Sequence, residues 1–314
     1  MDKSIIFSCV IPSSAKDFRS QNLKDLIASI KAQDFPQDQI EILVITEGDS
    51  EQAKGIGIKR AKGEICAMFC ADNKLMDKRD FGAVAFLFNL HGQKLTGIYS
   101  KQYRYVKDDN SLNRYFSLIG NNDPIAFYLN KCDRKPYYDG VDQPIAWEMI
   151  DFYASNPPSL GDNGFYIRRP FIMESSLDNY YPMDACLDMI KKGHSAFLRT
   201  GDLSIWHRTS DNLISFLIKR YKYARDLYSD RKDRRWRIID TTSDKWRLAY
   251  FVLATLTVIQ PLSISIRGFS KIKDLAWFWH WPVCFGFLVT YTLLAIRNLF
   301  KHGRLFQCAP LQPA

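Results

Sequence analysis

The sequence predicts an α/β protein: a doubly wound, mostly parallel sheet, followed by a basic amphipathic helix and a two-helix transmembrane hairpin. Strand-like and helix-like segments alternate through the first seventy residues, which indicates a parallel sheet with helices on both faces. A belt at 211–247 carries 11 Lys or Arg against 6 Asp or Glu, which is +5 of the net charge of +9. Two later stretches, Leu248–Ile266 and Leu275–Ile296, contain no Asp, Glu, Lys or Arg. Each is close to the roughly 20 residues needed to cross a bilayer.

The first half of the predicted sheet domain, which we expect at 1–210, is defined by apolar runs and helical periodicity. Short apolar runs next to Pro, Gly or polar clusters indicate strands, and apolar spacings of three and four indicate helices. The segments are strand Ile5–Ile11, helix Leu23–Ala32, strand Ile40–Ile45, helix Glu51–Ala61 and strand Ile65–Cys70. Gly55 and Gly57 lie inside a helical pattern rather than at the end of a strand, so they predict no dinucleotide fingerprint.

The second half of the domain is less regular. Residues 106–160 are polar, aromatic and rich in Asp, Asn and Pro, which indicates loops with short helices. The other expected elements are helix Phe81–His91, strand Leu95–Tyr105, a glycine turn and strand in Gly161–Arg169, a helix within Asp178–Lys192, and strand Ala196–Ile205 leading to Trp206-His207.

An acidic tip follows the buried strand Ile65–Cys70. In open α/β sheets ligands bind beyond the carboxyl ends of such strands. Asp72 and Asn73 stand at that position, where a carboxylate can hold a divalent cation together with substrate phosphates. The alternative is a plain turn, because Asp and Asn are frequent turn residues.

The chain after residue 210 predicts attachment to a membrane. We expect a basic membrane-surface segment at 211–245, two transmembrane helices within 246–298 (about 247–266 and 275–296) and a cytoplasmic tail at 299–314. The basic helix has the pattern of a segment lying on a bilayer, with a core-packed helix as the alternative. The positive-inside rule places the catalytic domain in the cytoplasm, in a multi-pass protein of the cell membrane. A re-entrant or interfacial hairpin is the alternative, because Pro261 and Pro282 interrupt the two stretches.

Composition excludes other classes. The seven cysteines are scattered and contain no C-x-x-C pair, so we expect reduced thiols and no zinc site. Net charge concentrated just before an apolar region indicates a membrane surface rather than nucleic acid, and no nucleic-acid partner is expected.

In its first two-thirds the chain resembles glycosyltransferase family 2, the inverting nucleotide-sugar enzymes with a GT-A fold. The resemblance rests on motifs in the family's order: Cys9-Val-Ile-Pro12, Glu41–Ser50, Lys59–Glu64, Cys70-Ala-Asp72-Asn73, Gly161–Arg169, and Tyr181–Leu187 followed by Lys191-Lys-Gly193. It implies a nucleotide diphosphate sugar as donor, a lipid-linked acceptor and a divalent metal, Mg²⁺ or Mn²⁺.

The resemblance also assigns roles to residues. Asp184 would be the catalytic base, and Asp72, with a weaker contribution from His207, would bind the metal. Nucleotide-sugar binding would involve Pro12, Glu47, Asp49, Lys59, Asp72 and Asn73. The acceptor side would involve Gly161, Asp162, Asn163, Gly164 and Met183. From the residues alone, the alternative for Asp184 is a helix N-terminal Asp, and the alternative for His207 is a hydrogen-bonded histidine at a strand end.

Two positions depart from the family's pattern. Cys70 stands where the first Asp of Asp-x-Asp is usual, and Met183 replaces the Glu of Glu-Asp. Lys232-Asp-Arg-Arg235-Trp236 half matches the Gln-x-x-Arg-Trp of processive synthases, but it lacks the Gln and we interpret it as a solvated basic face. The sequence therefore predicts a membrane-bound inverting glycosyltransferase acting on a lipid-linked glycan or a polyprenyl phosphate. The alternative is a catalytically degenerate GT-A membrane protein that binds a nucleotide sugar or a partner.

Overall fold

A mixed seven-stranded sheet forms the centre of the computed structural model, which describes residues 5–14, 20–139, 147–154, 157–178, 180–226 and 234–302. The strand order is β2-β1-β3-β7-β5-β8-β6. Five strands share one direction, and β7 and β6 run against their neighbours. The strands are β1 (Phe7–Pro12), β2 (Ile40–Ile45), β3 (Ile65–Met68), β5 (Gly97–Ser100), β6 (Trp147–Asp151), β7 (Phe165–Arg168) and β8 (Ala196–Thr200). The predicted alternation and the mostly parallel sheet are confirmed.

A second, two-stranded sheet pairs β4 (Asn73–Leu75) with β9 (Ile205–His207). We predicted one strand over Ala196–Ile205, but the chain turns between β8 and β9. The Thr200 hydroxyl donates to the Asp202 carboxylate and accepts the Asp202 backbone N–H, both at 3.1 Å, which stabilises this turn. The predicted strand Leu95–Tyr105 is likewise shorter, and β5 ends at Ser100.

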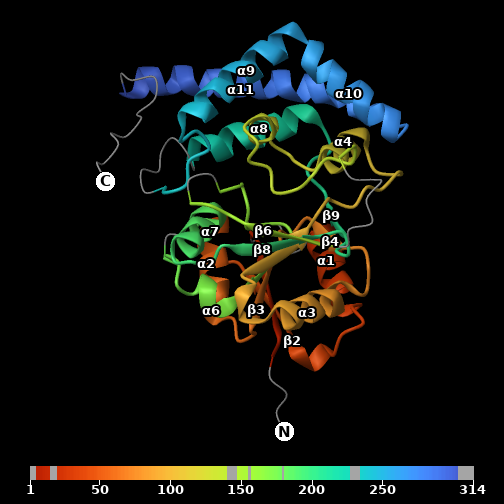
Figure 1. Ribbon diagram of the computed structural model, residues 1–314, viewed down its shortest axis with the longest axis vertical. Helices are drawn as coiled ribbons and strands as arrows, with labels where there is room; N and C mark the ends of the chain where they lie inside the picture. The colour runs from red at the N-terminus through yellow and green to blue at the C-terminus, as the bar shows by residue number, and fades with distance from the viewer. Residues whose placement is uncertain are drawn as a thin grey trace.

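Helices cover both faces of the large sheet (Figure 1). They are α1 (Gln21–Lys31), α2 (Ser50–Arg60), α3 (Asp80–His91), α6 (Arg169–Ile172) and α7 (Pro182–Lys191). Strand β1 shows the period-two alternation of a buried strand. Its residues Phe7, Cys9 and Ile11 pack in the core with α1 and α3, whereas Val10 packs on the opposite face in the core of α2 and α7.

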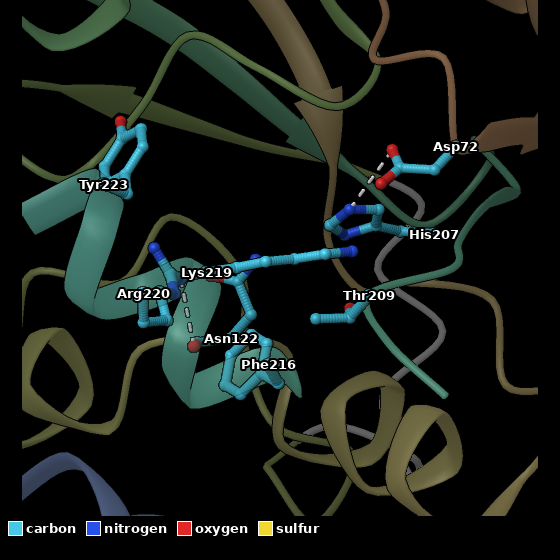
Figure 2. A pocket seen from close by; sticks show the side chains of 8 residues that line it. All are labelled: Asp72, Asn122, His207, Thr209, Phe216, Lys219, Arg220 and Tyr223. Atoms are coloured by element: carbon cyan, nitrogen blue, oxygen red, sulfur yellow. Dashed lines mark hydrogen bonds and ion pairs between the residues drawn. The ribbon is translucent and has the colours of Figure 1, made fainter. Parts of the chain in front are cut away.

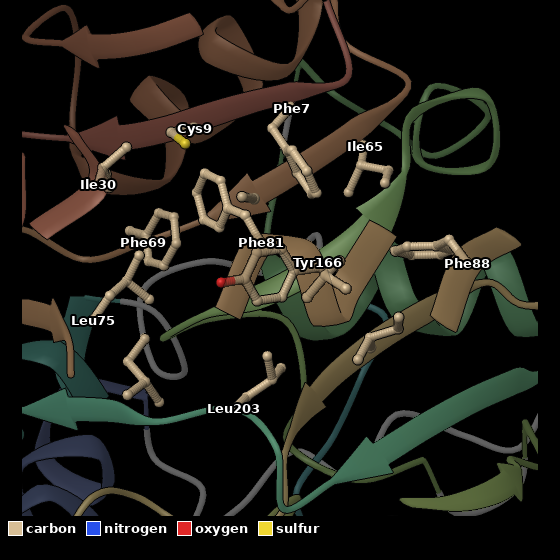
Figure 3. Packing of buried hydrophobic residues seen from close by; sticks show 14 of the residues in the cluster. Phe7, Cys9, Ile30, Ile65, Phe69, Leu75, Phe81, Phe88, Tyr166 and Leu203 are labelled. Atoms are coloured by element: carbon tan, nitrogen blue, oxygen red, sulfur yellow. The ribbon is translucent and has the colours of Figure 1, made fainter. Parts of the chain in front are cut away.

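Aromatic rings fill the first of these cores (Figure 3). The ring of Phe7 stacks on that of Phe81 at 4.7 Å between centroids, and Tyr166 meets both rings edge-on at 6.0–6.3 Å. These contacts join β1, α3 and β7, so the strand that reverses direction is fixed by the same cluster as the first strand.

Gly55 and Gly57 of α2 are packing glycines, which supports our rejection of a dinucleotide fingerprint. A Cβ on Gly55 would clash with the carbonyl of Leu177, and one on Gly57 would clash with the Val10 side chain. Because protein interiors are close-packed, only glycine lets α2 approach the sheet and the segment before α7 this closely.

A third core lies at the end of the molecule opposite the N-terminus (Figure 1). It is formed by α4 (Ser111–Ile119), α5 (Pro124–Tyr128), α8 (Leu213–Ala224), α9 (Thr242–Thr257), α10 (Ile259–Lys271), the 3₁₀ turn η5 (Leu275–Trp279) and α11 (His280–His302). Phe216 of α8 is buried in this core and Leu217 packs against it. The predicted basic helix therefore packs against the protein along its apolar face.

The two-helix transmembrane hairpin is not confirmed. Instead of one helix over about 247–266, the structure has α9 and α10, which meet at an angle of 81°. The break is at Val258, whose φ of +64° is unusual for a β-branched residue, and Pro261 follows it in the first turn of α10. The second predicted span corresponds to η5 and α11, since Leu275–Phe300 is long and apolar enough to cross a bilayer. Of the predicted tail at 299–314, residues from 303 onwards lie outside the described chain.

We predict that Gly57→Ala destabilises the sheet domain by about 1–3 kcal/mol, because the added methyl overpacks the contact of α2 with Val10. Gly82→Ala is the matched control. A Cβ there meets nothing within 4 Å, so it should be neutral or stabilise the helix by up to about 1 kcal/mol. Denaturant unfolding of the purified proteins measures both changes. Equal effects of the two substitutions would contradict the close-packing account.

Candidate functional site

The pairing of β4 with β9 places Asp72 beside His207. Asn73 is directly opposite His207 in this sheet, and the Arg208 backbone N–H donates to the Asp72 carbonyl at 3.0 Å. His207 Nε2 lies 3.5 Å from Asp72 Oδ1. Two residues that are 135 positions apart in the sequence thus form one polar pair at the carboxyl end of β3.

A cavity of about 280 Å³ opens at this pair (Figure 2). Its lining residues come from the turn before β4, from β9 and the residues after it, from α8 and from the segment before α5: Asp72, Asn122, His207, Thr209, Phe216, Lys219, Arg220 and Tyr223. Figure 2 shows the Lys219 side chain reaching from α8 towards the Asp72–His207 pair. The cavity therefore has a carboxylate and an imidazole on one side and two cations on the other.

The two cations are held differently. The Arg220 guanidinium donates to the Asn122 carbonyl at 3.0 Å and lies 5.5 Å from the centre of the Phe216 ring. Lys219 is exposed and has no carboxylate within ion-pair distance in the described part of the chain. Arg220 is thus fixed in the wall, while Lys219 has its ammonium available to an anion in the cavity.

Asn73 connects the pair to the predicted acceptor-side turn at 161–164. Its side-chain oxygen accepts the Cys70 backbone N–H at 2.9 Å, and its amide donates to the Asn163 side chain at 3.0 Å. Asn163 has a φ of +57°, and its carbonyl accepts from Arg134 at 2.6 Å. Gly161 has a φ of +124°, and a Cβ there would come within 2.6 Å of Pro182, so the turn also lies against the start of α7.

A buried charge cluster lies next to the same turn. Lys54 of α2 is 3% exposed and pairs with Glu51 at 3.1 Å and with Asp162 at 2.9 Å. Burial lowers the pKa of the Lys54 ammonium, but Asp162 and Glu51 outweigh that effect and hold it well above its usual value. Burial, followed by repulsion from Asp162, raises the pKa of the Cys70 thiol, so Cys70 stays protonated and is no substitute for a carboxylate.

The pair could form part of a metal site. Asp72 Oδ1 and His207 Nδ1 are buried and make no hydrogen bond within the described residues. No group of three or more His, Cys, Asp or Glu suited to a metal occurs in the described ranges. A divalent cation held by Asp72 would keep several positions for water and phosphate oxygens, as Mg²⁺ does when it is bound through one or two carboxylates and a phosphate substrate.

Four of the residues predicted on the nucleotide side lie outside the cavity lining and are used in local structure: Pro12, Glu47, Asp49 and Lys59. Glu47 and Arg60 form a solvent-exposed bidentate pair, with a shorter distance of 2.7 Å. Asp49 caps α2 by accepting the Gln52 backbone N–H at 2.9 Å. Lys59 pairs with Asp178 on the surface. Pro12 ends β1 and is buried.

Asp184, the predicted base, is fully buried at the start of α7. Its carboxylate accepts the backbone N–H groups of Trp236 at 2.7 Å and Arg235 at 3.2 Å, and the Nε–H of Arg234 at 3.1 Å. Asp184 is absent from the described cavity lining, and its role as a base stays a prediction. Met183, predicted on the acceptor side, packs against Trp236.

The expectation of a solvated basic face around Trp236 is wrong. Trp236 is 2% exposed, and its indole N–H donates to the Pro157 carbonyl at 3.1 Å. Arg235 pairs with Asp188 at 2.8 Å, one turn of α7 beyond Asp184. The charged residues that surround Trp236 in the sequence provide no indication that this side chain is buried. Lys232 and Asp233 lie outside the described residues.

Sequence reasoning thus found Asp72, Asn73, Asn163 and His207, which the structure brings together. It missed the site roles of Lys54 and Arg134, which carry no local signal. It identified Lys219 and Arg220 as basic but assigned them to a membrane surface. The helical pattern in the sequence predicts which residues of α8 share a face. Which of these faces lines the cavity is decided only by the tertiary contact with α11.

Comparison with known proteins identifies the class of fold. No protein family model matches the chain, and no curated protein matches it. The mannosyltransferase PcManGT from Pyrobaculum calidifontis, solved with GDP-Man and Mn²⁺, has a TM-score of 0.50 at 10% identity, covering 96% of this chain and 88% of that one. Residues 1–349 of TarS from S. aureus give a TM-score of 0.41 at 12% identity, covering 96% and 92%.

PcManGT is a mannosyltransferase, and the likeness to it shows that this chain has a GT-A-like fold. At such low identity the likeness establishes the fold alone. Membership of family 2 stays a prediction.

We predict that Asp184→Asn lowers the free energy of unfolding by about 2 kcal/mol, because an amide nitrogen would face buried N–H donors. Asp188→Asn is the control, since its pair with Arg235 is partly exposed and should contribute less than about 1 kcal/mol. Unfolding curves of the two variants compare them. A fully stable Asp184→Asn protein would contradict this anchoring role.

Proposed function

We propose that this protein is a membrane-bound inverting glycosyltransferase, which transfers a sugar from a nucleotide diphosphate sugar to a lipid-linked acceptor at the cytoplasmic face. One observation carries the proposal: the Asp72–His207 pair faces Lys219 and Arg220 across one cavity in a GT-A-like fold. A diphosphate leaving group needs its developing charge neutralised, and preorganised cations and hydrogen-bond donors do this effectively inside a cavity.

Residues on two opposite walls of the cavity would bind the diphosphate of the donor. Asp72 and His207 would hold a divalent cation, and that cation would neutralise diphosphate oxygens. Lys219 and Arg220 would bind the diphosphate from the opposite wall. Asn73 and Asn163, tied together at 3.0 Å, would keep the acceptor-side turn in register with this wall.

The hydrogen bonds of the Asp184 carboxylate help to distinguish between the two classes of acceptor, a hydroxyl and a phosphate. A hydroxyl acceptor needs a base that takes its proton. The Asp184 carboxylate is fully buried and accepts three hydrogen bonds from residues 234–236. A polyprenyl phosphate attacks with an oxygen that is already anionic, so this observation favours the phosphate acceptor over a glycan hydroxyl.

A second candidate is a catalytically degenerate domain that binds a nucleotide sugar without turnover. Cys70 favours it, because the protonated thiol leaves Asp72 as the one carboxylate of the motif. This candidate predicts saturable donor binding, no product with any lipid acceptor, and indifference of binding to Asp184.

The first test of the proposal uses the purified full chain in detergent with UDP-, GDP- and dTDP-sugars, polyprenyl phosphate, and Mn²⁺ or EDTA. We expect release of one nucleotide that requires the metal and falls at least a hundredfold in Asp72→Asn, on the order of 3 kcal/mol in the barrier. Asp108→Asn, at an exposed acid outside the cavity, is the control. Donor binding with no transfer would support the degenerate domain instead.

The second test addresses the cationic wall. Lys219→Ala should weaken nucleotide diphosphate binding about tenfold, because one ammonium is lost from the cavity, and Lys219→Arg should restore most of the affinity. Lys222→Ala, an exposed Lys of the same helix that lies outside the cavity lining, is the matched control. Titration calorimetry at fixed salt compares the three variants. Equal losses for Lys219→Ala and Lys222→Ala would refute a specific contact.

A further inference from the structure

The segment between the two predicted membrane spans is bonded to the catalytic domain. A transmembrane hairpin would place residues 267–274 on the far side of the bilayer. In the structure Arg267 pairs with Asp139 at 2.8 Å, and Asp274 accepts from Arg114 at 2.8 Å and from the Tyr105 hydroxyl at 2.6 Å. Both ends of the segment therefore lie on the same side as the sheet domain.

Helix α11 lies along the protein rather than leaving it. Its first residue, His280, is 2.8 Å from the Tyr115 hydroxyl of α4. Near the middle of the apolar span Leu275–Phe300, a Cβ on Gly286 would come within 2.6 Å of Leu217 of α8. If α11 crossed a bilayer, this contact would carry α8 and its lysines towards the hydrocarbon centre, where a charged side chain costs at least about 2.5–3.5 kcal/mol.

The bent pair of helices α9 and α10, which we call the arch, also contacts the rest of the protein at both of its helices. The Lys131–Asp244 ion pair, at 2.9 Å and almost fully buried, fixes the start of α9. Gln260, two residues beyond the break at Val258, accepts a hydrogen bond from the Tyr128 hydroxyl of α5. The apolar part of α9, Leu248 to Thr257, is about 15 Å long, which is half the thickness of the hydrocarbon core.

The outer faces of these helices are apolar and exposed. In α9 and α10 the exposed apolar side chains recur at helical spacing, and in α11 they form one stripe opposite the buried Val283, Cys284 and Phe287. They are Trp246, Tyr250, Leu253, Leu256, Ile259, Leu262, Ile266, Trp281, Phe285, Val289, Leu293, Ile296 and Phe300. This face, which we call the outer apolar face, exceeds the scattered exposure normal for a soluble surface.

Charge lies at the margins of this face. Lys245 is exposed in the first turn of α9, and Lys271 and Lys273 are exposed at the end of α10. Trp246 and Trp281 lie on the face itself, and tryptophan is enriched where hydrocarbon meets headgroups. Apolar helices flanked by lysine and tryptophan match the interfacial zone of an anionic leaflet.

We infer that α9, α10 and α11 form a one-sided membrane anchor, which lies in the plane of one anionic leaflet and does not cross the bilayer. Figure 1 shows α11 running across the long axis of the molecule beneath the arch of α9 and α10, as an in-plane anchor requires. The inference concerns attachment and holds whether or not the cavity transfers a sugar.

Sidedness is tested by labelling the full chain in sealed membrane vesicles of both orientations with a membrane-impermeant maleimide. Ser270→Cys reports on the segment between the spans and Asp108→Cys on the catalytic domain. Both positions are exposed, and wild-type labelling is subtracted. We expect the two variants to label from the same side only. Labelling of Ser270→Cys from the opposite side would overturn the inference and establish the hairpin.

The leaflet contact is tested by flotation of detergent-free protein with vesicles of phosphatidylcholine alone or with 30% phosphatidylglycerol (an assay composition). Leu253→Glu/Leu256→Glu should lower the bound fraction at least tenfold, because it places two charges on the outer apolar face. Phe86→Glu/Leu90→Glu, at exposed positions of α3, is the matched control and should bind like wild type.

A second copy of this chain is the competing occupant of the outer apolar face. It predicts a dimer that stays soluble without detergent, ignores both kinds of vesicle and dissociates in Leu253→Glu/Leu256→Glu. That result, measured by light scattering alongside flotation, would overturn the membrane assignment while leaving nucleotide binding in the cavity unaffected.

Discussion

The pairing of β4 with β9 is the constraint on which the functional part of the molecule depends. It joins residues 73–75 to residues 205–207, so the first and last parts of the sheet domain meet at the carboxyl end of β3. The same pairing sets His207 beside Asp72 and directs the chain into α8 six residues later. The pairing therefore positions the Asp72–His207 wall directly and fixes where the chain enters α8, which carries the opposite wall.

Three large hydrophobic cores stabilise this arrangement. Two of them clamp the large sheet, and the third joins α4, α5 and α8 to the C-terminal helices. Because α8 belongs to the third core and also lines the cavity, the C-terminal helices and the candidate site share a wall. Attachment to a leaflet would thus fix the cavity at a defined height above the lipid headgroups.

The sequence was sufficient for the parts of the fold that local periodicity controls. The bounds of β2 agree with prediction, and α1, α2 and α3 agree to within about two residues. Prediction failed where tertiary contacts decide. The break at Val258 lies inside a stretch without charged residues, and the burial of Trp236 depends on α7, which is distant in sequence. Asp72 and His207 were identified as candidates, but their proximity follows from a pairing that no local pattern reveals.

The two carboxylates of α7 attach the segment after residue 233 to this helix. Asp184 and Asp188 lie one helical turn apart and hold Arg234, Arg235 and Trp236 between them. Helix α7 and residues 234–236 are joined at these two points, so they are expected to move together. Any movement of this segment away from α7 must therefore break two ion pairs together.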